Sequence, residues 1–227
     1  MTPARGRALG AAGRWIDPAL ALADRVALRA VWTGGALLLA AAILVSVDVT
    51  IRKLFHLSVG GADELSGYAF AIGIAWAFPF ALLRRANVRI DALYQHLPAR
   101  LAAALDLLAL IALAVFVTVL ARYAWEVLAA SWKLDALSNS QLKVPLWIPQ
   151  GLWFTGLALF FATTLVLTLR TGLALLSGDL ARVRALAGAR SLEEEAADEA
   201  AYGKTLAETG APALASNTAS AAETRAP

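Results

Sequence analysis

Four stretches of the chain are apolar and almost free of Asp, Glu, Lys and Arg over a length that suits a membrane crossing. A transmembrane helix needs roughly 20 mostly apolar residues, whereas a barrel strand alternates polar and apolar positions, which these stretches do not. The sequence therefore predicts an all-α integral membrane protein. Its four transmembrane helices are expected at residues 30–47, 65–83, 101–121 and 144–169.

The segments outside these stretches differ in character. In residues 1–29, Asp17 and Pro18 are typical of a helix N-cap followed by a first-turn proline, which predicts a short surface helix before the first span. Residues 171–190 carry several arginines among apolar positions, which indicates a weak amphipathic helix on anionic lipid. Residues 191–227 are rich in Ala, Ser, Thr and Glu and predict a disordered tail.

The distribution of basic residues predicts the orientation of the chain. Lys and Arg concentrate on the cytoplasmic side of membrane proteins. Three segments are the most basic, namely the one before the first span, the one between the second and third spans, and the one after the fourth. We therefore expect both termini in the cytoplasm. Tryptophans close to the expected span ends agree with an interfacial belt: Trp32, Trp125, Trp132, Trp147 and Trp153.

The composition narrows the functional classes. The chain is 59% apolar and 16% charged, against about 45–50% and about 25% in soluble domains. It has no Cys, which excludes disulfides, thiolate metal sites and a Cys nucleophile. No Walker-type, HExxH or GxSxG motif is present, so we expect neither an enzyme nor a bound cofactor or metal. The basic residues flank apolar runs and form no single stripe, which argues against nucleic-acid binding.

Charged residues sit near the ends of the expected spans. A carboxylate at mid-membrane would be typical of a self-sufficient transporter, and no span has one near its midpoint. Asp106 comes closest, one or two turns from the end of the third span, where water or Arg100 is expected to reach it. Arg122 and Glu126 have the spacing of an ion pair on one helix face.

Two further features concern the second span. Asp63 and Glu64 open it, where carboxylates suit the positive end of the helix dipole; helix capping and contact with a partner protein both remain open. Trp76 lies near its middle and is expected at a helix–helix interface. Small residues recur at every fourth position and predict close helix packing: Gly67, Ala71, Ala75, and Gly73, Ala77, Ala81.

A series of short motifs extends this interpretation. Arg52 and Lys53 precede GADELSGY at 61–68, RRANVRID at 84–91 and LP at 97–98, and PLWIPQ follows at 145–150. In this order the motifs resemble the small membrane subunit of tripartite ATP-independent periplasmic (TRAP) transporters, over roughly residues 31–170. Many members have His where this chain has Asn87, which weakens any need for an ionisable group at that position.

The resemblance implies a bacterial inner-membrane protein that acts through partners. It implies a scaffold subunit of a sodium-coupled transporter for organic acids. The subunit would support a large multi-span permease and help to dock a periplasmic substrate-binding protein. The candidate contact residues are, on the outer side, Arg52, Asp63 and Glu64, on the inner side Arg84, Arg85 and Asp91, and between helices Trp76.

Two other interpretations remain open at this point. A stand-alone dimeric four-helix transporter would favour a carboxylate at mid-membrane. A membrane anchor for a redox enzyme would favour paired intramembrane histidines, whereas His56 and His96 are expected on opposite membrane sides.

Overall fold

The structure is a computed structural model that describes residues 16–57, 60–86, 97–188 and a few positions beyond them (196–197, 200–201 and 203–205). Four long helices dominate it: α2 (Asp17–Phe55), α3 (Ala62–Leu83), α5 (Ala99–Lys133) and α6 (Trp147–Ser177). A short helix, α7 (Leu180–Ala187), follows α6. All four long helices are long and apolar enough to cross a membrane, which confirms the predicted all-α, four-helix architecture.

Residues 1–188 and 189–227 form separate compact units. In the second unit the few described positions are helical. The predicted tail at 191–227 therefore lies almost wholly outside the described residues.

The helices extend beyond the charge-free stretches that predicted them. α2 runs without a break from Asp17 to Phe55, so the structure has one helix where the sequence suggested a surface helix followed by a span. No Gly or Pro stands between Pro18 and Gly34 to interrupt it, and a charged residue such as Arg25 does not end a helix. Two of the long helices end instead at left-handed residues, α2 at His56 and α6 at Gly178.

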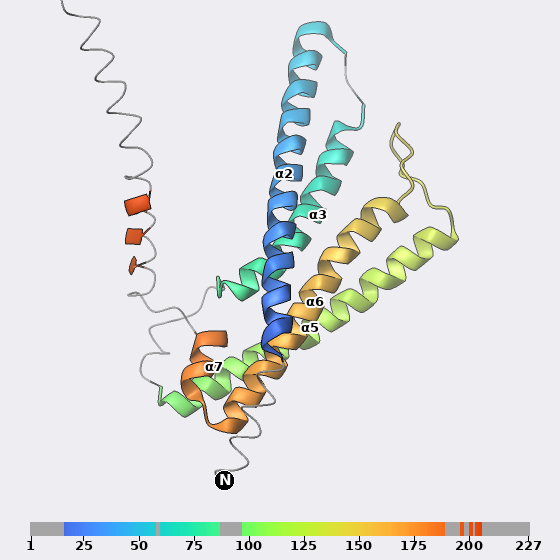
Figure 1. Cartoon of the computed structure of the whole chain (residues 1–227). Coiled ribbons are helices and arrows are strands. Elements are labelled where there is room, and N and C mark those ends of the chain that lie inside the picture. Colours follow the sequence, from blue (N-terminus) through green and yellow to red (C-terminus); the bar gives the residue numbers. More distant parts are fainter. Residues whose placement is uncertain are drawn as a thin grey trace, which may run out of the picture. The chain divides into compact units, whose positions relative to one another are not determined.

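The long helices pack in the order α2, α3, α6, α5 (Figure 1). α3 contacts both α2 and α6, α6 contacts α5 as well, and α7 folds back onto α5 and α6. The α7 contact is apolar, with Val183 buried beside Ala103 and Ala174. The outer helices α2 and α5 thus leave long apolar surfaces uncovered.

Small residues set the closest approaches between helices. Gly34 of α2 lies against Gly73 of α3, where an added Cβ would come within 3.0 Å of the Gly73 carbonyl oxygen. Gly156 of α6 lies against α3, where an added Cβ would come within 2.8 Å of the Ala75 carbonyl carbon. Gly67, by contrast, has no atom within 4 Å of an added Cβ. Of the predicted small-residue pattern, Gly73 and Ala75 therefore lie at helix crossings and Gly67 does not.

Candidate functional site

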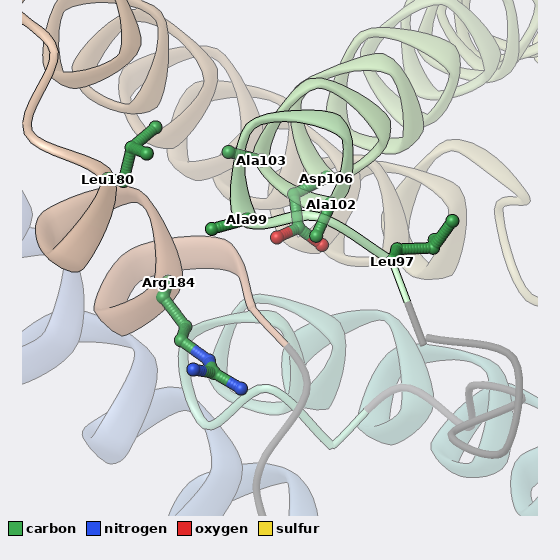
Figure 2. A pocket seen from close by; sticks show the side chains of 7 residues that line it. All are labelled: Leu97, Ala99, Ala102, Ala103, Asp106, Leu180 and Arg184. Carbon is green, nitrogen blue, oxygen red and sulfur yellow. The ribbon is translucent and has the colours of Figure 1, made fainter. Parts of the chain in front are cut away.

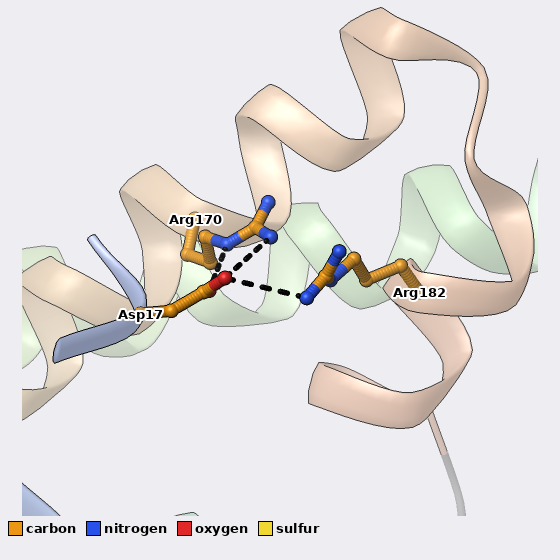
Figure 3. Close-up of polar contacts among 3 residues, drawn as sticks. All are labelled: Asp17, Arg170 and Arg182. Carbon is orange, nitrogen blue, oxygen red and sulfur yellow. Dashed lines mark hydrogen bonds and ion pairs between the residues drawn. The ribbon is translucent and has the colours of Figure 1, made fainter. Parts of the chain in front are cut away.

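An ion-pair cluster joins the start of α2 to the end of α6 and to α7 (Figure 3). The Arg170 Nε of α6 donates to Asp17 Oδ1 at 2.7 Å, and Arg182 Nη2 of α7 lies 3.3 Å from Asp17 Oδ2. The Arg170 side chain is 2% exposed, whereas Asp17 is 38% exposed. A buried guanidinium is costly unless a carboxylate pairs with it, so Asp17 holds the three helices together at this end.

The sequence did not anticipate this cluster. Asp17 was expected to cap α2, but it is the first residue of the helix, no side-chain cap is formed, and its carboxylate binds arginines instead. Arg170 was interpreted as a boundary charge after the fourth span. It lies inside α6, on the buried face that also carries Leu167 and Ala174. The apolar periodicity of this helix face continues past Arg170, and this pattern could have predicted that Arg170 lies inside the helix.

The turn between α6 and α7 places Arg182 in this cluster. Gly178 adopts φ 81°, a left-handed conformation that glycine takes without steric cost, and it ends α6. Asp179 then caps α7 by accepting a hydrogen bond from the Arg182 backbone N–H at 3.0 Å. The chain therefore reverses within two residues and returns α7 to the end of α6.

Arg84 and Arg85, two of the predicted partner contacts, also interact within the chain at this end. Arg84 Nη2 lies 3.1 Å from Asp24 Oδ1 of α2, and its guanidinium stacks over the Phe80 ring at 5.0 Å. Arg85 Nη1 donates to the Arg184 carbonyl oxygen at 3.4 Å. These contacts connect the end of α3 with α2 and α7. We call this region, where α2 and α5 begin and α3, α6 and α7 end, the α7 end.

A cavity of about 210 Å³ lies at the same end, between α5 and α7 (Figure 2). Asp106 and Arg184 supply its charged groups, and the rest of the lining is apolar: Leu97, Ala99, Ala102, Ala103 and Leu180. Asp106 is 3% exposed. α7 packs over the first turns of α5 and buries this residue; that water or Arg100 reaches it stays a prediction.

The opposite end, which we call the loop end, contains the 134–146 connection between α5 and α6. This loop packs onto the start of α3, with Gln141 beside Gly60 and Leu142 beside Gly61. The Glu64 carboxylate accepts a hydrogen bond from Tyr68 Oη at 2.5 Å and also faces two serine hydroxyls of the loop, Ser138 and Ser140.

The two carboxylates that open α3 have different surroundings. Asp63 is exposed, and Ser66 Oγ donates to its backbone carbonyl. Glu64 is partly buried, accepts from Tyr68 through Oε1 and lies beside Ser138 and Ser140 of the loop. No side-chain hydrogen bond caps α3, whose N-cap is Gly61. Both carboxylates lie in the first turn of the helix, where they suit the positive end of its dipole, so helix capping and contact with a partner protein both stay predictions.

The remaining ion pairs described at the loop end join residues of one helix. Arg52 pairs with Asp48 of α2; its own side chain is 55% exposed, while that of Asp48 is buried. Arg122 Nε lies 2.9 Å from Glu126 Oε1 on α5, which confirms the predicted pair. Arg52 therefore reaches the surface while anchored to its own helix.

Trp76 lies between α3 and α6. Its Nε1–H donates to the Leu152 carbonyl oxygen at 2.9 Å and to Thr155 Oγ1 at 3.2 Å, and its ring lies against Gly156. Asp91, the last predicted contact residue, lies outside the described residues, as does Asn87. The structure thus places Arg84 and Arg85 at the α7 end, Arg52, Asp63 and Glu64 towards the loop end, and Trp76 in the interior.

This arrangement suits a structural role more than chemistry on a substrate. In the part of the chain that the structure describes, no three His, Asp or Glu side chains gather as metal ligands would. The clusters at both ends connect elements of the same chain, and the broad surfaces of α2 and α5 are apolar. Such surfaces are typical of contact with lipid or with another membrane protein.

Comparison with known proteins supplies the family. No curated protein and no solved structure matches the chain. The family model described as "Tripartite ATP-independent periplasmic transporters, DctQ component" matches residues 41–173, which is more than half of the chain. The match includes α3, α5, most of α6 and the last part of α2. The chain therefore belongs to the DctQ family, the small permease component of TRAP transporters.

Proposed function

We propose that this chain is the scaffold subunit of a sodium-coupled TRAP transporter for organic acids. In this proposal it supports a large multi-span permease in the membrane and helps to dock a periplasmic substrate-binding protein. The observation that carries the proposal is that the four long helices pack in a row, so the two outer helices have uncovered faces. α2 and α5 lie at the two edges and keep large apolar side chains exposed: Trp32, Leu39, Ile43, Leu108, Val115 and Phe116.

Family membership supplies the coarser part of this assignment. As a DctQ component, the chain is a multi-pass inner-membrane protein and part of a tripartite transporter. The sodium coupling, the organic-acid cargo and the docking role come from the resemblance of the motifs. Two ion pairs within the chain, Asp17 with Arg170 and Asp24 with Arg84, support a bracing role, because they fix helices to one another.

At the loop end, three residues are candidates for contact with the periplasmic protein. Arg52 and Asp63 have exposed side chains, and Glu64 holds the 134–146 loop beside them. In the predicted orientation this end faces the periplasm. Replacing Glu64 by Lys is expected to lower uptake, because it disturbs both the loop and the local charge; uptake at the wild-type rate with normal complex recovery would remove Glu64 from the docking surface.

Purification under mild detergent tests the partnership. A tagged full-length chain, expressed from its own genomic neighbourhood, is expected to retain a larger multi-span membrane protein at a fixed stoichiometry. A variant with Leu108 and Val115 both changed to Arg places charge on the exposed face of α5 and is expected to lower this recovery. The matched control, Lys133 and Asp135 both changed to Arg, alters exposed positions of the 133–135 turn. Recovery of the wild-type chain alone, in an active form, contradicts the proposal.

A further inference from the structure

A long apolar groove runs between α2 and α3 on the side of α2 that no other described helix covers. Its volume is about 690 Å³, and one aromatic wall comes from Phe80 of α3. The remaining lining residues are on α2: Leu28, Val31, Trp32, Gly35, Ala36 and Leu39. Gly35 leaves the groove open, because nothing lies within 4 Å of where its Cβ would be. A narrow apolar groove of this kind suits a hydrocarbon chain.

Two arginines stand at the α7 end of this groove. Arg25 and Arg29 are exposed, and their side chains make no hydrogen bond or ion pair with any described residue. The nearest carboxylate in sequence, Asp24, is already paired with Arg84. Like charges four residues apart on a helix repel each other, so an anion between Arg25 and Arg29 would stabilise both.

The helix geometry places the arginines along one edge of the groove, the edge formed by Trp32 and Ala36. At 100° per residue, these four residues lie within about 60° of one another around α2, whereas Gly35 lies about 80° from Arg25 and about 120° from Arg29. Side chains on a helix point towards its N-terminus, so both guanidinium groups extend away from the apolar groove and towards the membrane surface. Trp32 is 74% exposed between them and the groove, the position that tryptophan takes at a membrane interface.

We propose that this site binds a phospholipid with an anionic headgroup. Arg25 and Arg29 hold the phosphate, Trp32 lies at the glycerol level, and one acyl chain occupies the groove past Gly35 towards Leu39. The order of two cations, an interfacial aromatic residue and an apolar groove is complementary to such a lipid along its whole length. The proposal goes beyond the transporter assignment and does not depend on it, because it concerns this chain alone.

Native mass spectrometry of the purified full-length chain tests the proposal, with phosphatidylglycerol as the anionic probe and phosphatidylcholine as the zwitterionic one. The wild-type chain is expected to retain one phosphatidylglycerol more tightly than phosphatidylcholine. Changing both arginines to Gln is expected to weaken phosphatidylglycerol binding roughly 30-fold, from about 1 kcal/mol for each cation near an anionic surface. The matched control, Arg122→Gln, removes an exposed cation at the other end and is expected to change nothing.

A second variant tests the groove. Gly35→Leu adds a side chain at a position whose Cβ would have no atom within 4 Å, and it is expected to reduce retention of both lipids. Ala40→Leu, exposed and outside the lining, is expected to leave retention unchanged. Thermal unfolding verifies that each variant is folded. Equal retention of the two lipids by the wild-type chain, or undiminished phosphatidylglycerol binding without Arg25 and Arg29, overturns the proposal. Loss of a co-purifying membrane protein with Gly35→Leu, at unchanged lipid retention, would show that a protein helix occupies the groove.

Discussion

The two ends of the helical unit are held together by different kinds of contact. At the α7 end, ion pairs join different helices: Asp17 of α2 binds Arg170 of α6 and Arg182 of α7, and Asp24 binds Arg84 after α3. At the loop end, each described ion pair stays within one helix. The 134–146 loop, which joins α5 to α6, contacts the α2–α3 connection at Gly60 and Gly61.

The difference indicates which end is fixed most firmly. The Asp17–Arg170 pair joins two helices and includes a buried guanidinium, so removal of one partner costs much stability. The Arg52–Asp48 and Arg122–Glu126 pairs each stay within one helix and hold no second helix in place. The α7 end is therefore expected to act as the anchored base of the unit. At the loop end, the loop contacts α3 through the serine hydroxyls that face Glu64. We therefore expect a bound partner to shift the helices more easily at this end.

The largest expected effect comes from breaking the α7 end. Asp17→Asn leaves Arg170 buried without a counter-charge and should lower the free energy of unfolding by about 3 kcal/mol, the low side of the range for buried pairs because water reaches Asp17. Denaturant titration in detergent micelles measures it. The control is Glu126→Gln at the loop end, where the exposed pair predicts a loss of about 0.2–1 kcal/mol. Equal losses for the two variants would remove the distinction between the ends.

A double variant sharpens the same prediction. Changing Asp17 to Asn and Arg170 to Met together removes the buried charge as well as its partner. It is expected to recover a large part of the stability lost in Asp17→Asn. No recovery would mean that Asp17 acts mainly through Arg182.

The next effect concerns the loop end. Glu64→Ala removes the acceptor for Tyr68 and the group that faces Ser138 and Ser140, which should lower the free energy of unfolding, by less than Asp17→Asn does. It should also release the loop, so that trypsin cleaves faster after the exposed Lys143. Asp63→Ala, one residue earlier and exposed, is the matched control and should change neither quantity. Similar cleavage in both variants would show that Glu64 does not hold the loop.

The smallest effect concerns the crossing that connects the two hairpins. Gly156→Ala brings a methyl group against the α3 backbone at Ala75 and should cost about 1–2 kcal/mol. Gly67→Ala, with free space around it, should be neutral or slightly stabilising. Equal stability of the two variants would mean that the contact between α3 and α6 at Gly156 contributes little to the stability of the helical unit.

The transmembrane architecture could be predicted from the sequence because the lipid environment leaves few alternatives. Backbone groups in lipid must be satisfied internally, so long uncharged stretches become helices. The helix ends were harder to predict. The first charged residue ends an uncharged stretch of sequence, whereas α6 continues to the left-handed residue Gly178. Contact between residues 153 positions apart, as for Asp17 and Arg170, has no local signature.

Among the candidate contact residues, too, some placements could be predicted from the sequence and others could not. Trp76 was predictable as an interior residue because an indole at mid-span is poorly placed for headgroups. Arg84 and Arg85 were predicted as partner contacts because they belong to a basic segment. Their contacts within the chain, Arg84 with Asp24 and Arg85 with the Arg184 carbonyl oxygen, could not be predicted, because the apolar face of α7, Val183 and Ala187, gave only a weak sequence signal.

Reconstituted transport tests the central assignment most directly. Proteoliposomes would contain this chain alone, the large membrane protein that co-purifies with it alone, or both proteins, in every case with the periplasmic binding protein and a sodium gradient. The account predicts uptake of an organic acid only when the large protein is present, and a markedly lower rate when this chain is left out. Sodium-driven uptake by this chain alone, or full uptake in its absence, would contradict the account.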